Sequence, residues 1–211
     1  MQRQLELGPR PPRRIDLGEG CLLDLHEPYG DAAQCEADRD ELTAALPWVQ
    51  EIYRRPGVEH AIAAPRLTAF VGDDGADYAY AGLRYAPHAW VPRLDSLRAQ
   101  VQHAAGQAFN CVLANLYRDG QDSVGYHADD EPELGPARDD IVVASLSLGA
   151  PRRFVLKHRR SGERTHFELG EGQLLVMRGR TQRHYVHALP KTRRAVGPRL
   201  NLTFRVVIGG R

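Results

Sequence analysis

Hydrophobic and polar residues alternate in short runs along the second half of the chain, and this pattern predicts β-strands. Gly, Pro and charged residues separate the runs, with turn signals such as Ser161–Gly162 and Gly170–Glu171–Gly172 between them. Many short strands at this spacing are typical of an antiparallel sandwich or barrel. The expected strands are Cys111–Tyr117, Ile141–Leu148, Arg153–Lys157, Thr165–Glu168, Gln173–Met177, His184–Ala188 and Leu200–Ile208.

Two helices are expected ahead of these strands. The first covers Asp38–Leu46, with Asp38 as its candidate N-cap. The second begins at Pro92 and ends near Gly106. Its apolar residues follow at i, i+3 and i+7: Leu94, Leu97 and Val101. Helices first and strands afterwards predict a mainly β protein with flanking helices (α+β), whose jelly-roll core, a double-stranded β-helix, has an N-terminal helical buttress.

The length of 211 residues, 42% of them hydrophobic, suits one domain with a sizeable core. We expect residues 1–14, which include a Pro- and Arg-rich stretch, to be a flexible arm. Residues 15–211 are then a single domain, with the N-terminal region reaching to about residue 110 and the jelly-roll core covering 111–208.

Cysteine usage and hydropathy limit the compartment and exclude some classes of site. Cys21, Cys35 and Cys111 are odd in number and lack C-x-x-C spacing, which argues against a disulfide framework or a structural zinc. The apolar runs are too short to span a membrane, and the N-terminus lacks the apolar region of a secretory signal. We therefore expect a cytoplasmic monomer with no membrane partner, associated with the nucleoid if the source is bacterial.

The net charge of +1 hides an asymmetry along the chain. Residues 1–150 carry 13 Lys and Arg against 24 Asp and Glu, whereas residues 151–211 carry 15 against 3. A dense basic segment attracts polyanions by counterion release, and nucleic acid is the obvious one. The alternative is a solvated surface balanced by the acidic half, and charge alone favours nucleic acid only slightly.

Three residues in the predicted strand region could hold a metal ion. His127 and Asp129 form a His-x-Asp pair, and His187 follows Asp129 by 58 residues. Residues i and i+2 of a strand point to the same face, so the pair could bind one ion. Two imidazoles and one carboxylate are the ligands of the facial triad of non-haem Fe(II) oxygenases. Taken alone, a His-x-Asp pair is common by chance, and a histidine in a strand is more often structural.

A polar face on the last predicted strand could bind an anion. Its polar residues alternate with apolar ones and share one face: Arg199, Asn201, Thr203 and Arg205. Two inward guanidinium groups are costly unless they meet an anion, and a dicarboxylate could span both. Asn115 and Tyr117, also at i and i+2, could hydrogen-bond the same ligand. The alternative is a half-exposed strand whose polar face lies in solvent.

Five segments of the chain carry a further resemblance: Asn115-Leu-Tyr-Arg-Asp-Gly120, His127-Ala-Asp-Asp-Glu131, Ala144-Ser-Leu-Ser-Leu-Gly149, Tyr185-Val-His-Ala-Leu-Pro190 and Pro198-Arg-Leu-Asn-Leu-Thr-Phe-Arg205. In this order they resemble the AlkB family of Fe(II)/2-oxoglutarate-dependent dioxygenases, which repair alkylated nucleobases, and within it the DNA-repairing branch. The resemblance runs from about Pro65 to Val207, roughly two thirds of the chain. Any one segment is modest evidence, but five at compatible spacing are highly specific.

The resemblance implies Fe(II) as the metal, 2-oxoglutarate as co-substrate and O2 as oxidant. It implies that the iron ligands, and with them the catalytic centre, are His127, Asp129 and His187. The residues implied to bind 2-oxoglutarate are Asn115, Tyr117, Arg199, Thr203 and Arg205. Arg199 would pair with the distal carboxylate and Arg205 with the carboxylate near the metal.

The region ahead of residue 110 would then include part of the base-recognition surface. The resemblance implies that Tyr78 and Tyr80 contact the target base and that Glu131 supplies an acid beside it. Without the resemblance, cross-strand packing of the two tyrosines is equally expected. Arg193 and Arg194 match a basic loop that grips the DNA backbone, a contact that carries no sequence information.

The implied reaction is oxidative demethylation of 1-methyladenine- and 3-methylcytosine-type bases in single- or double-stranded DNA. 2-Oxoglutarate and O2 would yield succinate, CO2 and formaldehyde. Val58 is the candidate for a position where duplex-repairing relatives carry a bulky aromatic wedge, and its small size favours single strands or RNA. The alternatives are the same chemistry on RNA or on a non-nucleic-acid substrate, and a nucleic-acid-binding jelly-roll with a vestigial or zinc-filled site.

Overall fold

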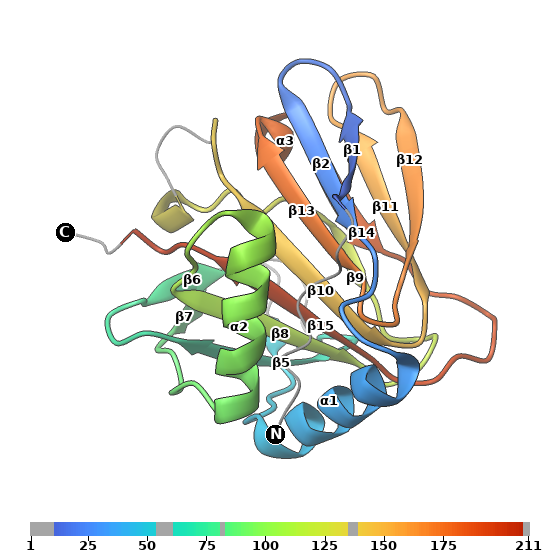
Figure 1. Cartoon of the computed structure of the whole chain (residues 1–211). Coiled ribbons are helices and arrows are strands. Elements are labelled where there is room, and N and C mark those ends of the chain that lie inside the picture. The colour runs from blue at the N-terminus through green and yellow to red at the C-terminus, as the bar shows by residue number, and fades with distance from the viewer. Residues whose placement is uncertain (1–10, 54–60, 81–82, 135–138, 209–211) are drawn as a thin grey trace.

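Two packed antiparallel sheets form the centre of the protein, and two helices cover the outer face of the larger sheet (Figure 1). The computed structural model describes residues 11–53, 61–80, 83–134 and 139–208. Within these residues the mainly β jelly-roll with helical buttress, predicted from the sequence, is confirmed. No helix in the described part of the chain is long and apolar enough to cross a membrane.

The larger sheet has seven strands in the order β1-β2-β13-β10-β15-β8-β5, and the smaller has four in the order β12-β11-β14-β9. The strands of the larger sheet are β1 Arg13–Asp16, β2 Cys21–His26, β5 Leu67–Gly72, β8 Cys111–Tyr117, β10 Val143–Gly149, β13 Leu174–Gly179 and β15 Arg199–Arg205. Those of the smaller sheet are β9 Val124–His127, β11 Arg152–His158, β12 Arg164–Leu169 and β14 Tyr185–Leu189.

Two short hairpins, three α-helices and one 3-10 turn complete the described structure. The hairpins are β3 Ile52–Tyr53 with β4 Ile62–Ala63, and β6 Tyr78–Tyr80 with β7 Leu83–Tyr85. The helices are α1 Ala32–Ala45, α2 Pro92–Ala105 and the short α3 Thr181–His184, with a 3-10 turn at Pro132–Leu134.

The larger sheet is buried on both faces, which explains its apolar strands. Alternate residues of β8 and β15, such as Val112 and Leu202, pack in a core with the helix residues Leu42, Leu94 and Leu97. The intervening residues point to the other side, where a second core lies between the two sheets. The polar residues of β8 and β15 belong to this inner side, so they end up between the sheets.

Helix α2 was predicted correctly, whereas α1 begins earlier than expected. Gly106 ends α2 with a φ of 61°, a conformation that glycine adopts without steric cost. The N-cap of α1 is Asp31, whose carboxylate accepts from the Gln34 backbone amide at 2.8 Å, and not Asp38. Asp38 lies buried inside the helix, where Tyr29 and Arg93 hydrogen-bond its carboxylate. Long-range partners therefore hold an aspartate that looks like a cap in the sequence.

Strands from the N-terminal region extend the larger sheet beyond the predicted jelly-roll core of 111–208, which contains β8–β15. Strands β1, β2 and β5 all belong to the larger sheet, and none of them was predicted. The expected arm of residues 1–14 also reaches too far, because Arg13 and Arg14 lie in β1. Arg14 pairs with the buried carboxylate of Asp24 at 2.7 Å, which helps fix this edge strand in place. Residues 1–10 lie outside the described residues.

Candidate metal centre

The smaller sheet brings His127, Asp129 and His187 together, as the sequence predicted. His127 on β9 stands opposite His187 on β14, with ring centroids 4.3 Å apart. The Oδ2 atom of Asp129 is 3.5 Å from Nε2 of His187, and one ligand atom from each residue lies within 4.8 Å of the others. One expectation fails, because β9 ends at His127 and Asp129 follows it as an irregular residue.

Hydrogen bonds and packing orient each of these side chains. Nδ1 of His127 is 2.8 Å from the carbonyl oxygen of Gly125, which can only accept, so the proton lies on Nδ1 and Nε2 keeps its lone pair. The amide side chain of Gln182 accepts from the Asp129 backbone N–H at 3.0 Å. The ring of Phe154 stacks on His187 at 5.3 Å between centroids. Such outer contacts commonly hold metal ligands in place.

The protonation states also suit a divalent ion. Burial lowers the pKa of His187 to about 3 and lowers the pKa of His127 as well. Burial alone would raise the pKa of Asp129, but Arg205 and the two imidazoles hold it at about 2. At neutral pH the three residues are therefore two neutral imidazoles and one carboxylate, the forms that bind metal. The donor set fits the facial triad of Fe(II) oxygenases.

A row of polar side chains faces this triad from the larger sheet. β15 pairs with β8 so that Arg199 stands opposite Tyr117 and Asn201 opposite Asn115. A pocket between the sheets joins this row to the triad. Its polar lining includes His127, Asp129, His187, Asn115, Tyr117, Arg199, Asn201, Thr203 and Arg205. The structure thus gathers all the predicted metal and 2-oxoglutarate residues around one pocket.

Arg199 is a buried cation without a matching anion among the described residues. Its side chain is 1% exposed, donates to the Ser147 hydroxyl at 2.7 Å and lies 5.4 Å from the ring centroid of Tyr117. Its Nη1 has no hydrogen-bond partner in the described part of the chain. Burial lowers the pKa of Arg199 to about 10, so it stays protonated at neutral pH. The half-exposed alternative for this strand is excluded, because all of β15 is buried.

Arg205 takes a different position at the other end of β15. It is 3% exposed, and its guanidinium hydrogen-bonds Oδ1 of Asp129, the oxygen not directed at His187. This contact keeps Asp129 ionised and fixes which oxygen faces the imidazoles. Arg205 therefore lies beside the metal ligands, while Arg199 lines the pocket near Tyr117 and is held by its hydrogen bond to Ser147.

Arg66 is a pocket residue that the sequence did not reveal. It is 5% exposed, lines the pocket and donates from Nε to the side-chain oxygen of Asn115 at 2.8 Å. Arg66 reaches Asn115 because Thr68 of β5 pairs with Asn115 of β8. Only this pairing of strands far apart in the sequence places it there, and no local motif marks it.

Of the residues predicted to contact the base, the structure describes the side chain of Glu131 but not those of Tyr78 and Tyr80. Glu131 is half-buried just after Asp129, but its side chain does not line the pocket. Tyr78 and Tyr80 lie at the two ends of β6, and their side chains lie outside the described part of the structure. Val58 also lies outside the described residues. The roles of these four residues stay predictions.

The basic loop between β14 and β15 is exposed but anchored. Arg193 and Arg194 are both exposed. Next to them, the backbone N–H of Thr192 donates to the carbonyl of Gly120 at 2.8 Å. A Cβ on Gly120 would come within 2.7 Å of the Thr192 carbonyl, so this close contact requires glycine. This contact anchors the loop directly beside its two exposed guanidinium groups.

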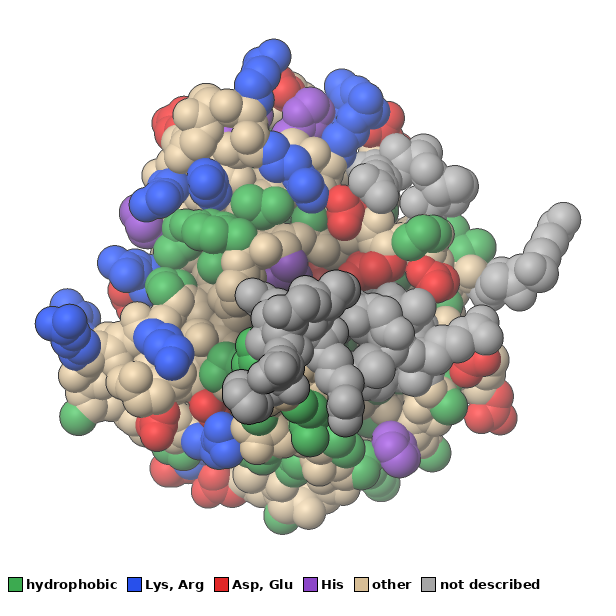
Figure 2. All heavy atoms as spheres, turned by 180° about the vertical axis from the view of Figure 1, so that it is seen from behind, with side chains coloured by type: hydrophobic (Ala, Val, Ile, Leu, Met, Phe, Trp, Pro, Cys, Tyr) green, Lys and Arg blue, Asp and Glu red, His purple; other side chains and the backbone are tan. Residues whose placement is uncertain are grey.

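A groove continues from His127 across the surface. It is lined by residues of β3, β4 and β9, including Tyr53, Ile62 and Tyr126. Tyr126 is 46% exposed, and Nζ of Lys157 lies 5.4 Å from its ring centroid. Lys and Arg side chains gather over the part of the face that holds the four-stranded sheet (Figure 2). An aromatic ring beside a cation is a combination suited to a nucleotide strand.

Comparisons with known proteins agree with this geometry. Residues 10–205 match the 2OG-Fe(II) oxygenase superfamily. The chain is 39% identical over 204 residues to the DNA oxidative demethylase ALKBH2 of Mus musculus, covering 90% of this chain and 82% of that protein. The Homo sapiens protein of the same name is 38% identical over 183 residues, covering 83% and 67%.

A second group of relatives and one solved structure complete the comparison. The alpha-ketoglutarate-dependent dioxygenase alkB homolog 3 of Homo sapiens is 36% identical over 194 residues, covering 87% of this chain and 65% of that protein. The solved structure of OsALKBH1 superposes with a TM-score of 0.60 over 92% of this chain and 99% of that one. At 16% sequence identity, this superposition supports the fold alone.

Proposed function

Since this chain belongs to the AlkB family of Fe(II)/2-oxoglutarate-dependent dioxygenases, we propose that it demethylates 1-methyladenine- and 3-methylcytosine-type bases in DNA. The observation that carries the proposal is one pocket in which a His-Asp-His triad faces a buried, unmatched arginine. The DNA substrate is supported by the names of the relatives and by the exposed basic loop. A cytoplasmic location and a monomeric state stay predictions.

The residues of the pocket divide into two proposed tasks. His127, Asp129 and His187 would hold Fe(II), and the guanidinium of Arg199 would pair with the distal carboxylate of 2-oxoglutarate. When bound, iron and 2-oxoglutarate supply the oxidation by O2 that releases succinate, CO2 and the methyl group as formaldehyde. Arg205 keeps Asp129 ionised and oriented with its Oδ2 atom toward His187. Asn115 and Tyr117 add polar groups to the lining of the same pocket.

The surface around the pocket would hold the nucleic acid. The target base must leave its stack to reach a buried site, which costs least in a single strand. We propose that the groove beside Tyr126 receives the nucleotides next to that base and that Arg193 and Arg194 contact phosphates. Tyr78, Tyr80 and Glu131 keep the base-contacting roles that the family resemblance implies.

A comparison of substrates tests the proposal. Oligonucleotides of one sequence, each with a single 1-methyladenine, are supplied as single-stranded DNA, duplex DNA or RNA, and formaldehyde release is measured for each. We expect kcat/KM to be higher for single-stranded DNA than for duplex DNA or RNA. Release from RNA alone would assign the enzyme to RNA, and release from none would remove the nucleic-acid substrate from the proposal.

Removing the two loop arginines should separate strand binding from chemistry. We expect the variant with Arg193→Ala and Arg194→Ala to lose about tenfold or more in kcat/KM on long DNA, with little change on a methylated mononucleotide. Each lost phosphate contact should reduce the slope of log K against log salt by about 0.7 for a single strand. A matched control replaces Arg13 and Arg164, which are exposed elsewhere. Equal losses on both substrates would contradict phosphate binding by this loop.

Tyr126 offers a test of the groove. Loss of stacking on one base costs about 1–3 kcal/mol, so Tyr126→Ala should raise the KM for a methylated single strand roughly 5- to 150-fold. Tyr126→Phe keeps the ring and should stay within about threefold of the unmodified enzyme. Steady-state formaldehyde assays measure both variants. If Phe and Ala have equal effects, the ring does not stack on the strand.

A further inference from the structure

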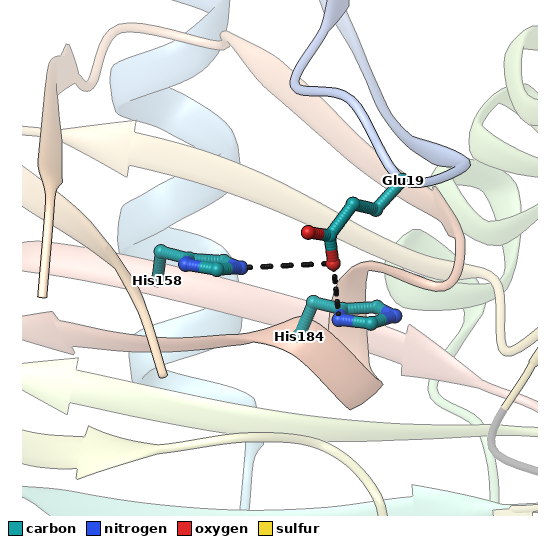
Figure 3. A group of neighbouring side chains, drawn as sticks. All are labelled: Glu19, His158 and His184. Atoms are coloured by element: carbon teal, nitrogen blue, oxygen red, sulfur yellow. Dashed lines mark ion pairs between the residues drawn. The ribbon is translucent and has the colours of Figure 1, made fainter. Parts of the chain in front are cut away.

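We propose that Glu19, His158 and His184 form a second metal site, on the surface, for a divalent transition-metal ion of the Zn²⁺ type. Among the described residues, two groups of His, Cys, Asp and Glu bring three ligand atoms within 4.8 Å of one another: the triad and this cluster. Figure 3 shows the two imidazoles directed at one carboxylate oxygen of Glu19. Neither the family resemblance nor the proposed demethylation assigns a task to these three residues.

The three side chains come from separate segments that the fold brings together. Glu19 lies in the turn between β1 and β2, in the larger sheet. His158 ends β11 and His184 ends α3, where the neighbouring residue Tyr185 pairs with His158. An ion bound here would therefore link a turn of the larger sheet to the end of β11 in the smaller sheet and to α3.

The distances fit a tetrahedral ion after small adjustments. Oε2 of Glu19 is 2.9 Å from Nδ1 of His184 and 3.9 Å from Nε2 of His158. Two ligand atoms on a tetrahedral Zn²⁺, each about 2.0–2.1 Å from the metal, lie about 3.3 Å apart. The observed separations fall on either side of that value, and all three side chains are at least partly accessible. Two imidazoles and one carboxylate also form a known zinc ligand set with a fourth position for water.

The backbone holds Glu19 in a strained position. Its φ is 54°, between Gly18 at 78° and Gly20 at 74°, and a positive φ is uncommon for a residue other than glycine. The turn is tightly fixed, because Arg180 N–H donates to the Gly20 carbonyl at 3.0 Å. A Cβ on Gly179 would come within 2.3 Å of that same carbonyl. Backbone strain of this kind often occurs at functional sites.

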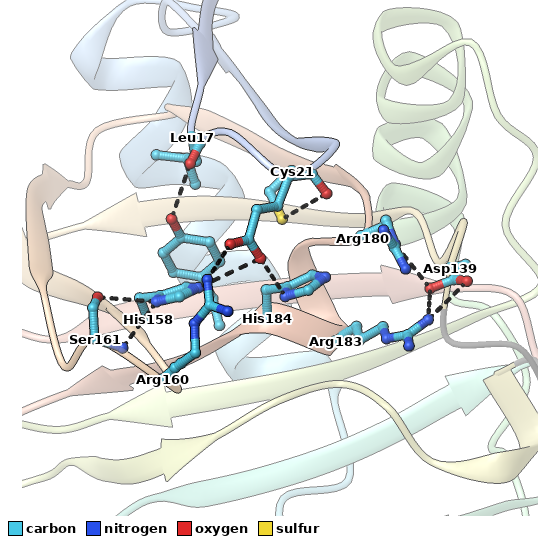
Figure 4. A network of polar contacts seen from close by, with 11 residues as sticks. Leu17, Cys21, Asp139, His158, Arg160, Ser161, Arg180, Arg183 and His184 are labelled. Atoms are coloured by element: carbon cyan, nitrogen blue, oxygen red, sulfur yellow. Dashed lines mark hydrogen bonds and ion pairs between the residues drawn. The ribbon is translucent and has the colours of Figure 1, made fainter.

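Contacts with Ser161 and Tyr185 fix the position of the His158 ring. Its Nδ1 is 2.9 Å from the Ser161 hydroxyl, and its ring packs against Tyr185 with centroids 5.0 Å apart (Figure 4). The Ser161 backbone N–H also donates to Nδ1 at 3.1 Å, so the proton of the neutral ring lies on Nε2, toward Glu19. A metal ion on Nε2 would displace that proton to Nδ1, where the Ser161 hydroxyl can accept it.

The effect of Arg160 distinguishes a metal site from a cluster held by hydrogen bonds alone. Its Nη2 binds the other oxygen of Glu19, Oε1, at 2.7 Å, and its side chain is 82% exposed. In a cluster held by hydrogen bonds alone, Arg160 adds to the attraction. Beside a bound dication, Arg160 is a competing positive charge. Removing Arg160 should therefore strengthen metal binding, whereas removing any of the three ligands should weaken it.

The test counts metal ions on the complete, untagged chain. After treatment with a chelator, the protein is titrated with Zn²⁺ against a coloured competing chelator, and native mass spectrometry gives the stoichiometry. We expect two ions per chain, one of them in the triad. Glu19→Gln and His158→Ala should each leave one, while Arg160→Ala keeps two and tightens the second about twofold or more. The control variants are Glu27→Gln, just after β2, and His166→Ala, on β12. Both residues are exposed.

The outcomes separate this site from the triad. Glu19→Gln and His158→Ala should keep Fe(II)-dependent succinate release, because they leave the pocket untouched. They should lose the Zn²⁺-dependent rise in Tm that the second ion gives by linking the two sheets. One ion on the unmodified chain, or two on both ligand variants, would overturn the site. Weaker metal binding in Arg160→Ala would favour the hydrogen-bonded cluster instead and would also overturn it.

Discussion

Arg199→Met is expected to impair 2-oxoglutarate binding and, at the same time, to stabilise the protein without 2-oxoglutarate. The guanidinium is buried and lacks an anion among the described residues. Removing one partner of a buried charge pair costs about 2–5 kcal/mol, so the KM for 2-oxoglutarate should rise about 30-fold or more. An apolar side chain of similar volume removes the cost of the buried charge, so Tm should rise by several degrees, at about 2–4 °C per kcal/mol.

The matched control is Arg152→Met. Arg152 is as deeply buried, at 2% exposure, but its guanidinium donates to the carbonyls of Asp119, Asp122 and Pro190 at 2.8–2.9 Å. Loss of these hydrogen bonds leaves buried acceptors without a donor, so Tm should fall while the KM for 2-oxoglutarate stays within about threefold. Two buried arginines should thus give opposite changes in Tm. An unaltered KM in Arg199→Met would place the co-substrate elsewhere.

Asp129→Ala is expected to reduce succinate release to background and also to destabilise the fold. Without the carboxylate, the triad has two neutral ligands and cannot hold Fe(II) as a facial triad does. The change also removes the carboxylate that forms an ion pair with the buried Arg205. Breaking a buried pair in this way costs about 3–5 kcal/mol. Thermal unfolding followed by circular dichroism should show a Tm lower by about 10 °C.

A second variant separates the two effects of Asp129. Combining Asp129→Ala with Arg205→Met removes both charges, so Tm should recover most of the loss while succinate release stays at background. Turnover above about one hundredth of the unmodified rate in either variant would contradict the assignment of Asp129 to the metal. A lowered Tm in the double variant, equal to that of the single one, would contradict the ion-pair explanation.

The sequence predicted three of the strands that carry the site, β8, β14 and β15, but missed β9 and the way in which the larger sheet is completed. β8 matches its predicted bounds, and β15 was recognised because Arg199–Arg205 alternates strictly between polar and apolar residues. β1, β2 and β5 come from the N-terminal region, where helices were expected. β1 pairs with the neighbouring β2, but β2 pairs with β13 and β5 with β8, strands that are distant in the sequence, and no local pattern encodes those pairings.

The same limit applies to individual site residues. His127, Asp129 and His187 could be predicted because their types and order follow a metal motif. Arg66 could not, because it becomes a pocket residue only when β5 lies beside β8. Glu19 could not either, because its neighbours in space are His158 and His184, which no spacing rule connects to it. Long-range contacts decide these positions, and they emerge only in the fold.

The central claim is that the pocket couples 2-oxoglutarate oxidation to demethylation of a base in DNA. The most direct measurement is the ratio of formaldehyde to succinate released from a 1-methyladenine oligonucleotide under Fe(II), 2-oxoglutarate and O2. We expect equal amounts of the two products and complete loss of formaldehyde when either Fe(II) or 2-oxoglutarate is left out. Succinate formed at the same rate with and without the methylated strand, and no formaldehyde, would contradict the account.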